Sequence, residues 1–272
     1  MVTLPISIAA AAALLLPGLA LAPSVQVRRR LGPPLVIVWA LCASPALWAL
    51  LLLWSARLDV VWGRATVWLV LLGLALLAWV RLRPRGSERH KARQGPLSAR
   101  ILPPAAAILI LAIALVLRFG EAEGLVAAPW VDGYHHTVIT QLFLDQQGLP
   151  QDYRPYLEAD GFDYHFGFHA LAALLSWLSG GDARLVVLWL GQLLCALVPL
   201  GLLLLGRQLG LGWLGQLTAQ ALASAWLWFP PYYLSWGRYT QLTGLLVLPA
   251  ALFTWQAAWR PGGRRQGARQ RL

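Results

Sequence analysis

Apolar segments of about 20 residues follow one another along this chain, and charged residues are almost absent from them. Of the 272 residues, 58% are hydrophobic and only 12% are charged, whereas soluble domains carry about 25% charged residues. A helix needs roughly 20 apolar residues to cross the hydrocarbon layer of a membrane. We therefore expect an all-α polytopic membrane protein with about seven transmembrane helices and two extracytoplasmic juxtamembrane helices.

The charged residues are separated along the chain by sign. There are 22 basic and 11 acidic residues, a net charge of +11, which in a soluble protein would suggest a nucleic-acid partner. Nine of the acidic residues and four of the five histidines, however, lie within residues 121–182, where Arg154 is the only basic residue. Most of the other basic residues cluster at 28–30, 81–100 and 260–271. Since basic loops stay cytoplasmic, we interpret this separation as membrane topology and expect no nucleic-acid partner.

The positive-inside rule, applied to these basic clusters, predicts how the chain crosses the plasma membrane. The predicted spans are residues 2–22, 34–54, 60–80, 101–118, 184–206, 211–230 and 241–259. The N-terminus is then outside and the C-terminus cytoplasmic. The apolar part of residues 164–179 is too short to span, and a crossing there would put the basic tail outside, so we expect an interfacial or re-entrant helix.

The same path divides the chain into parts. We expect three N-terminal transmembrane helices in residues 1–80, a basic cytoplasmic linker at 81–100, a membrane module at 101–259 and a basic cytoplasmic tail at 260–272. Within the module, residues 119–183 form the extracytoplasmic loop. This loop concentrates the titratable side chains on one face of the membrane, which makes it the place where we expect chemistry.

Two short helices are predicted within the extracytoplasmic loop. Asp132 stands where an N-cap is expected, and Gly148-Leu149-Pro150 stands where a helix ends. Asp163 has the same capping position before residues 164–179. Each helix carries two histidines near its start, namely His135 and His136 in the first helix and His165 and His169 in the second. We expect the two helices to meet at the outer membrane surface.

Three interpretations of this cluster remain open. In the first, Asp132 acts as a general base, since a carboxylate beside imidazoles can remove a proton from an acceptor hydroxyl. In the second, His165 and His169 share a helix face at spacing i, i+4 and bind a divalent metal, completed by His135, Asp132 or Asp163. In the third, the aspartates are plain N-caps and the histidines bond to loop backbone.

Arg238 is a lone cation at the predicted outer end of the sixth span. Aromatic residues surround it in the sequence: Tyr232, Tyr233, Trp236 and Tyr239. A guanidinium among aromatic rings at the head-group level suits a phosphate or pyrophosphate. The alternative is an arginine that snorkels to ordinary lipid head groups. Tryptophans near span ends, including Trp130 and Trp236, are typical of anchoring at the membrane interface.

Three segments together resemble the N-terminal module of the GT-C superfamily, the integral-membrane glycosyltransferases that use polyprenyl-phosphate-linked sugars. Trp130-Val-Asp-Gly-Tyr-His-His matches the catalytic aspartate that follows a span in that superfamily. Tyr164-His-Phe-Gly-Phe-His resembles its second juxtamembrane helix, and Ser235-Trp-Gly-Arg-Tyr resembles its lipid-phosphate segment. The resemblance covers residues 101–259. It departs at Gly133, where a second acidic residue is usual, so we expect a truncated or divergent member.

The resemblance implies transfer of a sugar from a polyprenyl-phosphate donor to an extracytoplasmic acceptor, with the lipid-linked donor and membrane lipids as partners. It implies Asp132 as the base, with His135 and His136 beside it, and Arg238 with Tyr239 at the donor phosphate. Asp163, His165 and His169 would line the acceptor side. The alternative is a non-enzymatic membrane protein, either a metal or solute transporter or an envelope-assembly scaffold. Spans nearly free of charge argue against a transporter.

Overall fold

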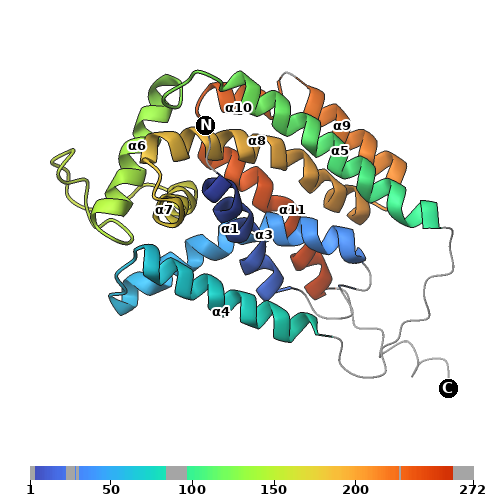
Figure 1. Ribbon diagram of the computed structural model, residues 1–272, viewed down its shortest axis with the longest axis horizontal. Coiled ribbons are helices and arrows are strands. Elements are labelled where there is room, and N and C mark those ends of the chain that lie inside the picture. The colour runs from blue at the N-terminus through green and yellow to red at the C-terminus, as the bar shows by residue number, and fades with distance from the viewer. Residues whose placement is uncertain (1–3, 23–27, 29–30, 84–96, 227, 260–272) are drawn as a thin grey trace.

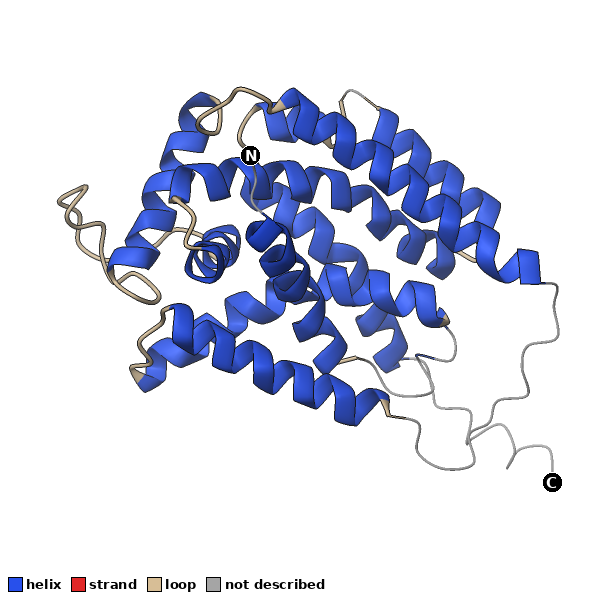
Figure 2. Cartoon of the chain, viewed as in Figure 1, coloured by secondary structure: helices blue, strands red, loops and turns tan. Residues whose placement is uncertain are grey.

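The computed structural model describes residues 4–22, 28, 31–83, 97–226 and 228–259, and over these residues the protein is helical and contains no strand (Figures 1 and 2). The helices are α1 (Leu4–Ala20), α3 (Pro33–Ser55), α4 (Arg64–Leu82), α5 (Leu97–Glu121), α6 (Trp130–Asp145), α7 (Gly167–Ser179), α8 (Ala183–Gln208), α9 (Trp213–Ala225), α10 (Pro231–Ser235) and α11 (Tyr239–Trp259). A short 3₁₀ helix, Ala56–Leu58, follows α3. The predicted all-α class is confirmed.

Five helical segments are long and apolar enough to cross a membrane. They are Pro33–Leu58, Arg64–Leu82, Arg100–Glu121, Ala183–Gln208 and Tyr239–Trp259. These segments correspond to five of the seven predicted spans. Helix α1 covers most of the predicted first span but has 17 residues, and α7, with 13 residues, is too short to cross. The short α7 agrees with the prediction for residues 164–179.

The predicted sixth span, residues 211–230, does not form one continuous helix. Helix α9 ends at Ala225 after 13 residues, a length of about 20 Å at 1.5 Å per residue. Pro230 and Pro231 follow closely, and a proline removes an N–H donor and disfavours helix in the residue before it. Helices α8 and α11 run in the same direction, because Gly191 lies against Tyr239 and Gly201 against Pro249. The chain therefore returns between them through α9 and the irregular segment beyond it.

The boundaries of α6 and α7 also differ from those predicted. Pro129 is the N-cap of α6, so Asp132 lies inside its first turn, where the positive end of the helix dipole still favours a carboxylate. Helix α7 begins at Gly167 with Phe166 as N-cap, so the predicted capping role of Asp163 is wrong. Both predictions failed because a polar residue before an apolar run marks a helix start only to within a few residues.

Helix α7 is enclosed by other helices. It packs against α1, α3, α4, α6, α8 and α11, and every side chain from Phe168 to Ser176 is buried. A helix that is apolar on all sides is stable only when neighbours cover all of its faces. Helices α6 and α7 lie together at one end of the bundle, on the left in Figure 1, and His136 of α6 contacts His169 of α7 there.

Helices α1 and α3 approach each other closely at Gly18. A Cβ atom at this position would collide with the backbone of Ala40. Nearby, Pro17 lacks the N–H group that would bond the carbonyl of Ala13 within α1. The indole of the buried Trp48 donates a 2.7 Å hydrogen bond to that carbonyl instead. The proline and the glycine therefore create the backbone surface on which α3 packs.

We expect Gly18→Ala to destabilise the protein by about 1–3 kcal/mol, because the added methyl group must push two helix backbones apart. Gly73→Ala in α4 is the matched control, since a Cβ there meets nothing within 4 Å and alanine is the better helix former. Thermal unfolding of the purified protein in detergent measures both. Equal melting temperatures for the two variants would show that the close approach is unimportant.

Candidate functional site

Two charged side chains far apart in the sequence meet at the α6–α7 end of the bundle. Asp132 extends from the first turn of α6, and Arg238 lies immediately before α11. The Nε atom of Arg238 is 3.5 Å from a carboxylate oxygen of Asp132, and the side chains are 45% and 42% exposed. The pair is therefore half-open to solvent, so both groups can still bind other molecules.

The Asp132–Arg238 pair lies between two adjoining hollows, which we call together the Asp132–Arg238 recess. The first hollow has a volume of about 240 Å³ and is lined by Trp130, Val131, Asp132, Trp236 and Arg238. The second has a volume of about 320 Å³ and is lined by Asp132, His136, Tyr164, His165, Arg238, Thr240 and Gln241. The recess thus combines a carboxylate, a guanidinium, imidazoles and aromatic rings.

A chain of hydrogen bonds connects the recess to the interior. His136 Nε2 is 2.7 Å from the carbonyl oxygen of Gly237, and His136 Nδ1 is 2.8 Å from His169 Nε2. A carbonyl only accepts, so Nε2 of His136 must carry the proton, and Nδ1 of a neutral His136 then accepts from His169. The side chains are only 2% and 0% exposed. The geometry therefore determines the tautomer of each ring and holds Gly237 against α6.

Burial keeps both imidazoles of this pair neutral. It lowers the pKa of His136 from 6.5 to about 4, although the Gly237 carbonyl and the charge of Asp132 favour protonation. Burial also lowers the pKa of His169 well below its usual value, and the neighbouring His136 adds to this effect. At neutral pH the pair therefore acts as a hydrogen-bonded support for the recess and carries no charge.

The lowered pKa of His136 predicts acid sensitivity. Between pH 6.5 and about 4 the unfolded chain binds a proton that the folded protein excludes, so stability should fall on acidification by about 1.4 kcal/mol per pH unit for this residue. Unfolding temperatures measured from pH 7.5 to 5 test this. We expect His136→Gln to show a shallower decline than the exposed control His135→Gln. Identical declines in the two variants would contradict the assignment.

Other predicted site residues also lie at the recess. His165 is exposed, and its Nε2 atom is 3.0 Å from the hydroxyl of Thr240 at the start of α11. Its ring stacks on Tyr164, with 4.0 Å between the ring centroids. Burial of the Tyr164 ring raises the pKa of its hydroxyl, and the charge of Asp132 acts in the same direction. His165 therefore occupies the edge of the recess, on the segment before α7.

Three predicted site residues lie elsewhere. His135 is exposed, contacts Tyr134 and lines neither hollow. Asp163 is exposed and accepts a 3.3 Å hydrogen bond from the hydroxyl of Tyr153. Tyr239 is fully buried, and its ring packs against His136 at a centroid distance of 5.4 Å. The ring of Tyr239 therefore supports the recess from the protein interior.

The predicted metal site lacks the necessary set of ligands. In the described part of the chain, no group of three or more histidine, cysteine, aspartate or glutamate side chains is placed to hold a metal ion. His165 precedes α7, so it does not share a helix face with His169. The Nε2 atom of His169 already bonds to His136. The i, i+4 spacing alone was therefore a misleading signal.

The predicted site residues did not include several that line the recess, namely Trp130, Tyr164, Thr240 and Gln241. Trp130 and Trp236 were predicted to anchor the protein at the membrane interface, and Gly237 was given no role. Gly237 could have been noticed from the sequence, because it lies between Trp236 and Arg238 in a polar and aromatic segment that follows two prolines, where a turn is expected. Its φ is +68°, a conformation that favours glycine.

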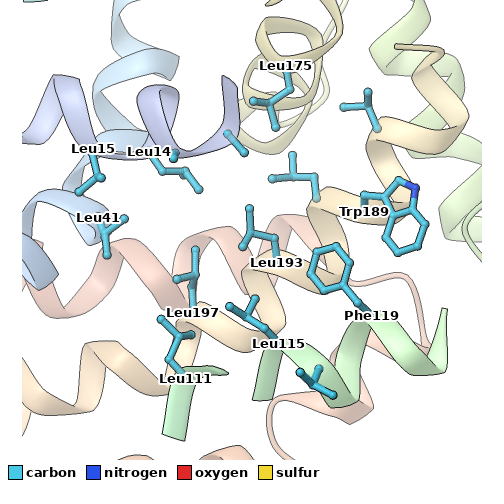
Figure 3. Close-up of a pocket in the computed structure, with 15 residues that line it drawn as sticks. Leu14, Leu15, Leu41, Leu111, Leu115, Phe119, Leu175, Trp189, Leu193 and Leu197 are labelled. Carbon is cyan, nitrogen blue, oxygen red and sulfur yellow. The ribbon is translucent and has the colours of Figure 1, made fainter. Parts of the chain in front are cut away.

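A second cavity lies among the helices of the bundle and is open on one side, where its lining residue Val116 is 73% exposed. It has a volume of about 520 Å³ and lies between α1, α3, α5, α7 and α8 (Figure 3). Leu14 and Leu15 point into it from one side and Phe119 and Trp189 from the other. All of its lining residues are apolar, and none of them lines the Asp132–Arg238 recess. Such walls suit a hydrocarbon chain better than a polar ligand.

These features define a class of protein, namely a helical bundle with helices of membrane-spanning length and a charged, aromatic recess at one end. The chain belongs to DUF6541, a family of unknown function, which it matches over residues 11–272. No curated protein matches the chain, and no solved structure does. The chemistry of the recess is therefore the basis for a functional proposal.

Proposed function

We propose that this protein is a GT-C-like integral-membrane glycosyltransferase that transfers a sugar from a polyprenyl-phosphate donor to an extracytoplasmic acceptor. The observation that carries the proposal is the half-exposed pair of Asp132 and Arg238 at 3.5 Å in an open recess. A carboxylate suits the acceptor hydroxyl, and a guanidinium suits the phosphate that leaves. This pairing supplies the two groups that a glycosyl transfer between an alcohol and a phosphate requires.

In the proposed reaction, the acceptor oxygen forms a bond to the anomeric carbon of the donor sugar. The bond between that carbon and the phosphate oxygen breaks, and its electron pair leaves with the lipid phosphate. Asp132 takes the proton of the acceptor hydroxyl, and Arg238 stabilises the charge that develops on the phosphate. Binding of phosphate by Arg238 would also loosen its contact with Asp132, which frees the carboxylate to act as the base.

The remaining groups of the recess are assigned supporting roles. His165, Thr240 and Gln241 line the second hollow and supply hydrogen-bonding atoms for the acceptor. His136 contacts the recess at its edge but is held by Gly237 and His169, so it positions the Arg238 segment. We assign no substrate contact to His135 or Asp163, because neither lines the recess.

A lipid-linked donor also requires an apolar environment and a recess on the correct side of the membrane. The cavity between α1 and α5 offers a carbon-lined space for a hydrocarbon chain. The basic segments 81–100 and 260–272 adjoin the C-terminal ends of α4 and α11 and the N-terminal end of α5. These three helix ends lie at the opposite end of the bundle from α6 (Figure 1). We count α1 and the interrupted α9 segment as crossings, and the resulting seven spans would put the recess and the N-terminus outside the plasma membrane and the C-terminus in the cytoplasm.

A transfer assay tests the proposal. The purified protein in lipid nanodiscs is mixed with radiolabelled polyprenyl-phosphate hexoses and pentoses and with membrane lipid or glycan acceptors. We expect sugar transfer from one donor, with release of polyprenyl phosphate. Arg238→Gln should slow release by about 10- to 100-fold, because a charged hydrogen bond to phosphate is lost. Arg184→Gln is the control, since Arg184 pairs with Asp182 and lines neither hollow. Failure of every donor, or equal rates for both variants, would contradict the proposal.

A further inference from the structure

Two tryptophan side chains face the same small hollow. Trp130 begins α6, Trp236 follows α10, and both line the 240 Å³ hollow with Asp132 and Arg238. Trp130 is 67% exposed and Trp236 is 46% exposed. Two indole rings thus flank a carboxylate and a guanidinium in a space open to a ligand.

The backbone of Trp130 has an unusual conformation. Its φ is +66°, in the left-handed region, which is rare for a bulky residue. Such conformations persist only where the surrounding structure imposes them, and they concentrate at functional sites. Anchoring at a membrane interface requires only that an indole reach the head groups, so it does not account for a strained backbone. The conformation places the ring of Trp130 at the hollow next to Asp132.

Trp236 is held by its neighbours. Its ring contacts Tyr232 at a centroid distance of 5.0 Å, and the guanidinium carbon of Arg238 is 5.7 Å from its ring centroid. A cation at this distance is attracted to an indole ring. Trp236 therefore forms part of the same unit as the Asp132–Arg238 pair.

The indole rings, carboxylate and guanidinium of this hollow match the groups of a sugar ring. A pyranose ring has apolar C–H faces, which pack on aromatic rings, and a rim of hydroxyl groups, which bond to carboxylates and guanidinium groups. A phosphate alone would need cations and no flat apolar surface. The hollow offers both kinds of contact within a volume suited to one monosaccharide.

We propose that Trp130, Trp236, Asp132 and Arg238 form a monosaccharide subsite that holds the sugar ring being transferred. The inference rests on the proposed transferase function, which it extends by assigning the place of the sugar. The indole faces bind the ring, and Arg238 stands at the edge where the phosphate of the donor would lie. Trp130 and Trp236 are thus substrate-binding residues, in contrast to the interfacial anchors that the sequence predicted.

Trp228 provides a matched control. It is exposed to the same extent as Trp130, 67%, and its ring packs on Tyr232 at 5.2 Å. It lines neither hollow of the recess. An anchoring role predicts the same behaviour for Trp228 and Trp130, whereas a sugar subsite predicts a difference between them.

The test is saturation-transfer-difference NMR on the protein in lipid nanodiscs, with the methyl pyranosides of glucose, mannose, galactose and N-acetylglucosamine as probes. We expect at least one probe to receive saturation, and Trp130→Ala and Trp236→Ala to reduce its signal by about fivefold or more. Trp228→Ala should keep the signal, and Trp130→Phe should keep part of it. The proposal is overturned if no probe receives saturation or if Trp130→Ala behaves like Trp228→Ala.

The variant Trp130→Gly tests whether the loss of probe signal in Trp130→Ala comes only from loss of folding. Trp130→Gly accommodates the positive φ, so it should unfold at the same or a higher temperature than the wild type and still lose the probe signal. The transfer assay then separates the two proposals. Wild-type transfer by the Trp130→Ala, Trp236→Ala protein would overturn the subsite and leave the transferase intact. Tryptophan-dependent probe binding without transfer from any donor would overturn the transferase and leave only a monosaccharide-binding site in the recess.

Discussion

Replacement of Asp132 by asparagine is expected to lower glycosyl transfer by about 10²- to 10⁴-fold, the usual contribution of a general base. The amide has nearly the same shape as the carboxylate, and Asp132 is half-exposed at the recess, so the fold should be preserved. Asparagine cannot take the proton of the acceptor hydroxyl. Transfer from the labelled polyprenyl-phosphate donor is the measurement, and full activity of the variant would refute the assignment of the base.

Asp163→Asn is the matched control for this variant. Asp163 is likewise a solvent-accessible carboxylate, but it lies in the loop before α7, bonds to Tyr153 and lines neither hollow. We expect it to retain the wild-type rate of transfer. A comparable loss in both variants would indicate that the general negative charge of the segment matters, and not a base at one position.

The second large effect is expected at Gly237. Its φ is +68°, and a Cβ atom there would lie 3.0 Å from both the Cβ atom of Asp132 and the backbone nitrogen of Gly133. Gly237→Ala therefore has a left-handed backbone cost of about 1–2 kcal/mol and a tight contact with α6, which we expect to disturb the position of Arg238 relative to Asp132. Unfolding should occur at a lower temperature, and transfer should fall by about tenfold or more, since misplacement by about 1 Å can cost 100-fold.

Gly161→Ala separates these two contributions. Gly161 has a φ of +78°, but a Cβ atom there meets nothing within 4 Å. This variant should lose only the stability associated with the left-handed backbone and keep its transfer rate. If Gly237→Ala also kept the wild-type rate, the position of Arg238 relative to Asp132 would be irrelevant to the reaction.

Some parts of the fold were predictable because they depend on local composition. A segment such as 184–206 or 241–259 is predominantly apolar over about 20 residues, and this property alone predicts a long helix. The interruption after Ala225 was harder to predict. Apolar residues continue beyond it, and the consequence of Pro230 and Pro231 depends on how α8 and α11 place the two ends of the connection.

In the candidate site, too, some features were predictable from local sequence and others depend on tertiary packing. Asp132 and Arg238 were both identified from sequence. Asp132 stands before a predicted helix and matches the GT-C resemblance, and Arg238 is a lone cation at the end of a predicted span. Their contact joins α6 to the segment before α11, and no local pattern links these two regions. Conversely, His135 and His136 are equivalent in the sequence, yet the rotation of α6 exposes one and buries the other against His169.

The sequence by itself determined the helical class, most of the membrane-length segments and the stretch of chain that carries the titratable groups. Hydrophobicity and charge act residue by residue, so their effects can be read without knowledge of neighbours. Only the tertiary structure decided which of those groups share a recess, that Tyr239 lies beneath it, and that Trp130 and Trp236 flank it. Those relations depend on how α6, α7 and α11 pack, and packing is a property of the whole chain.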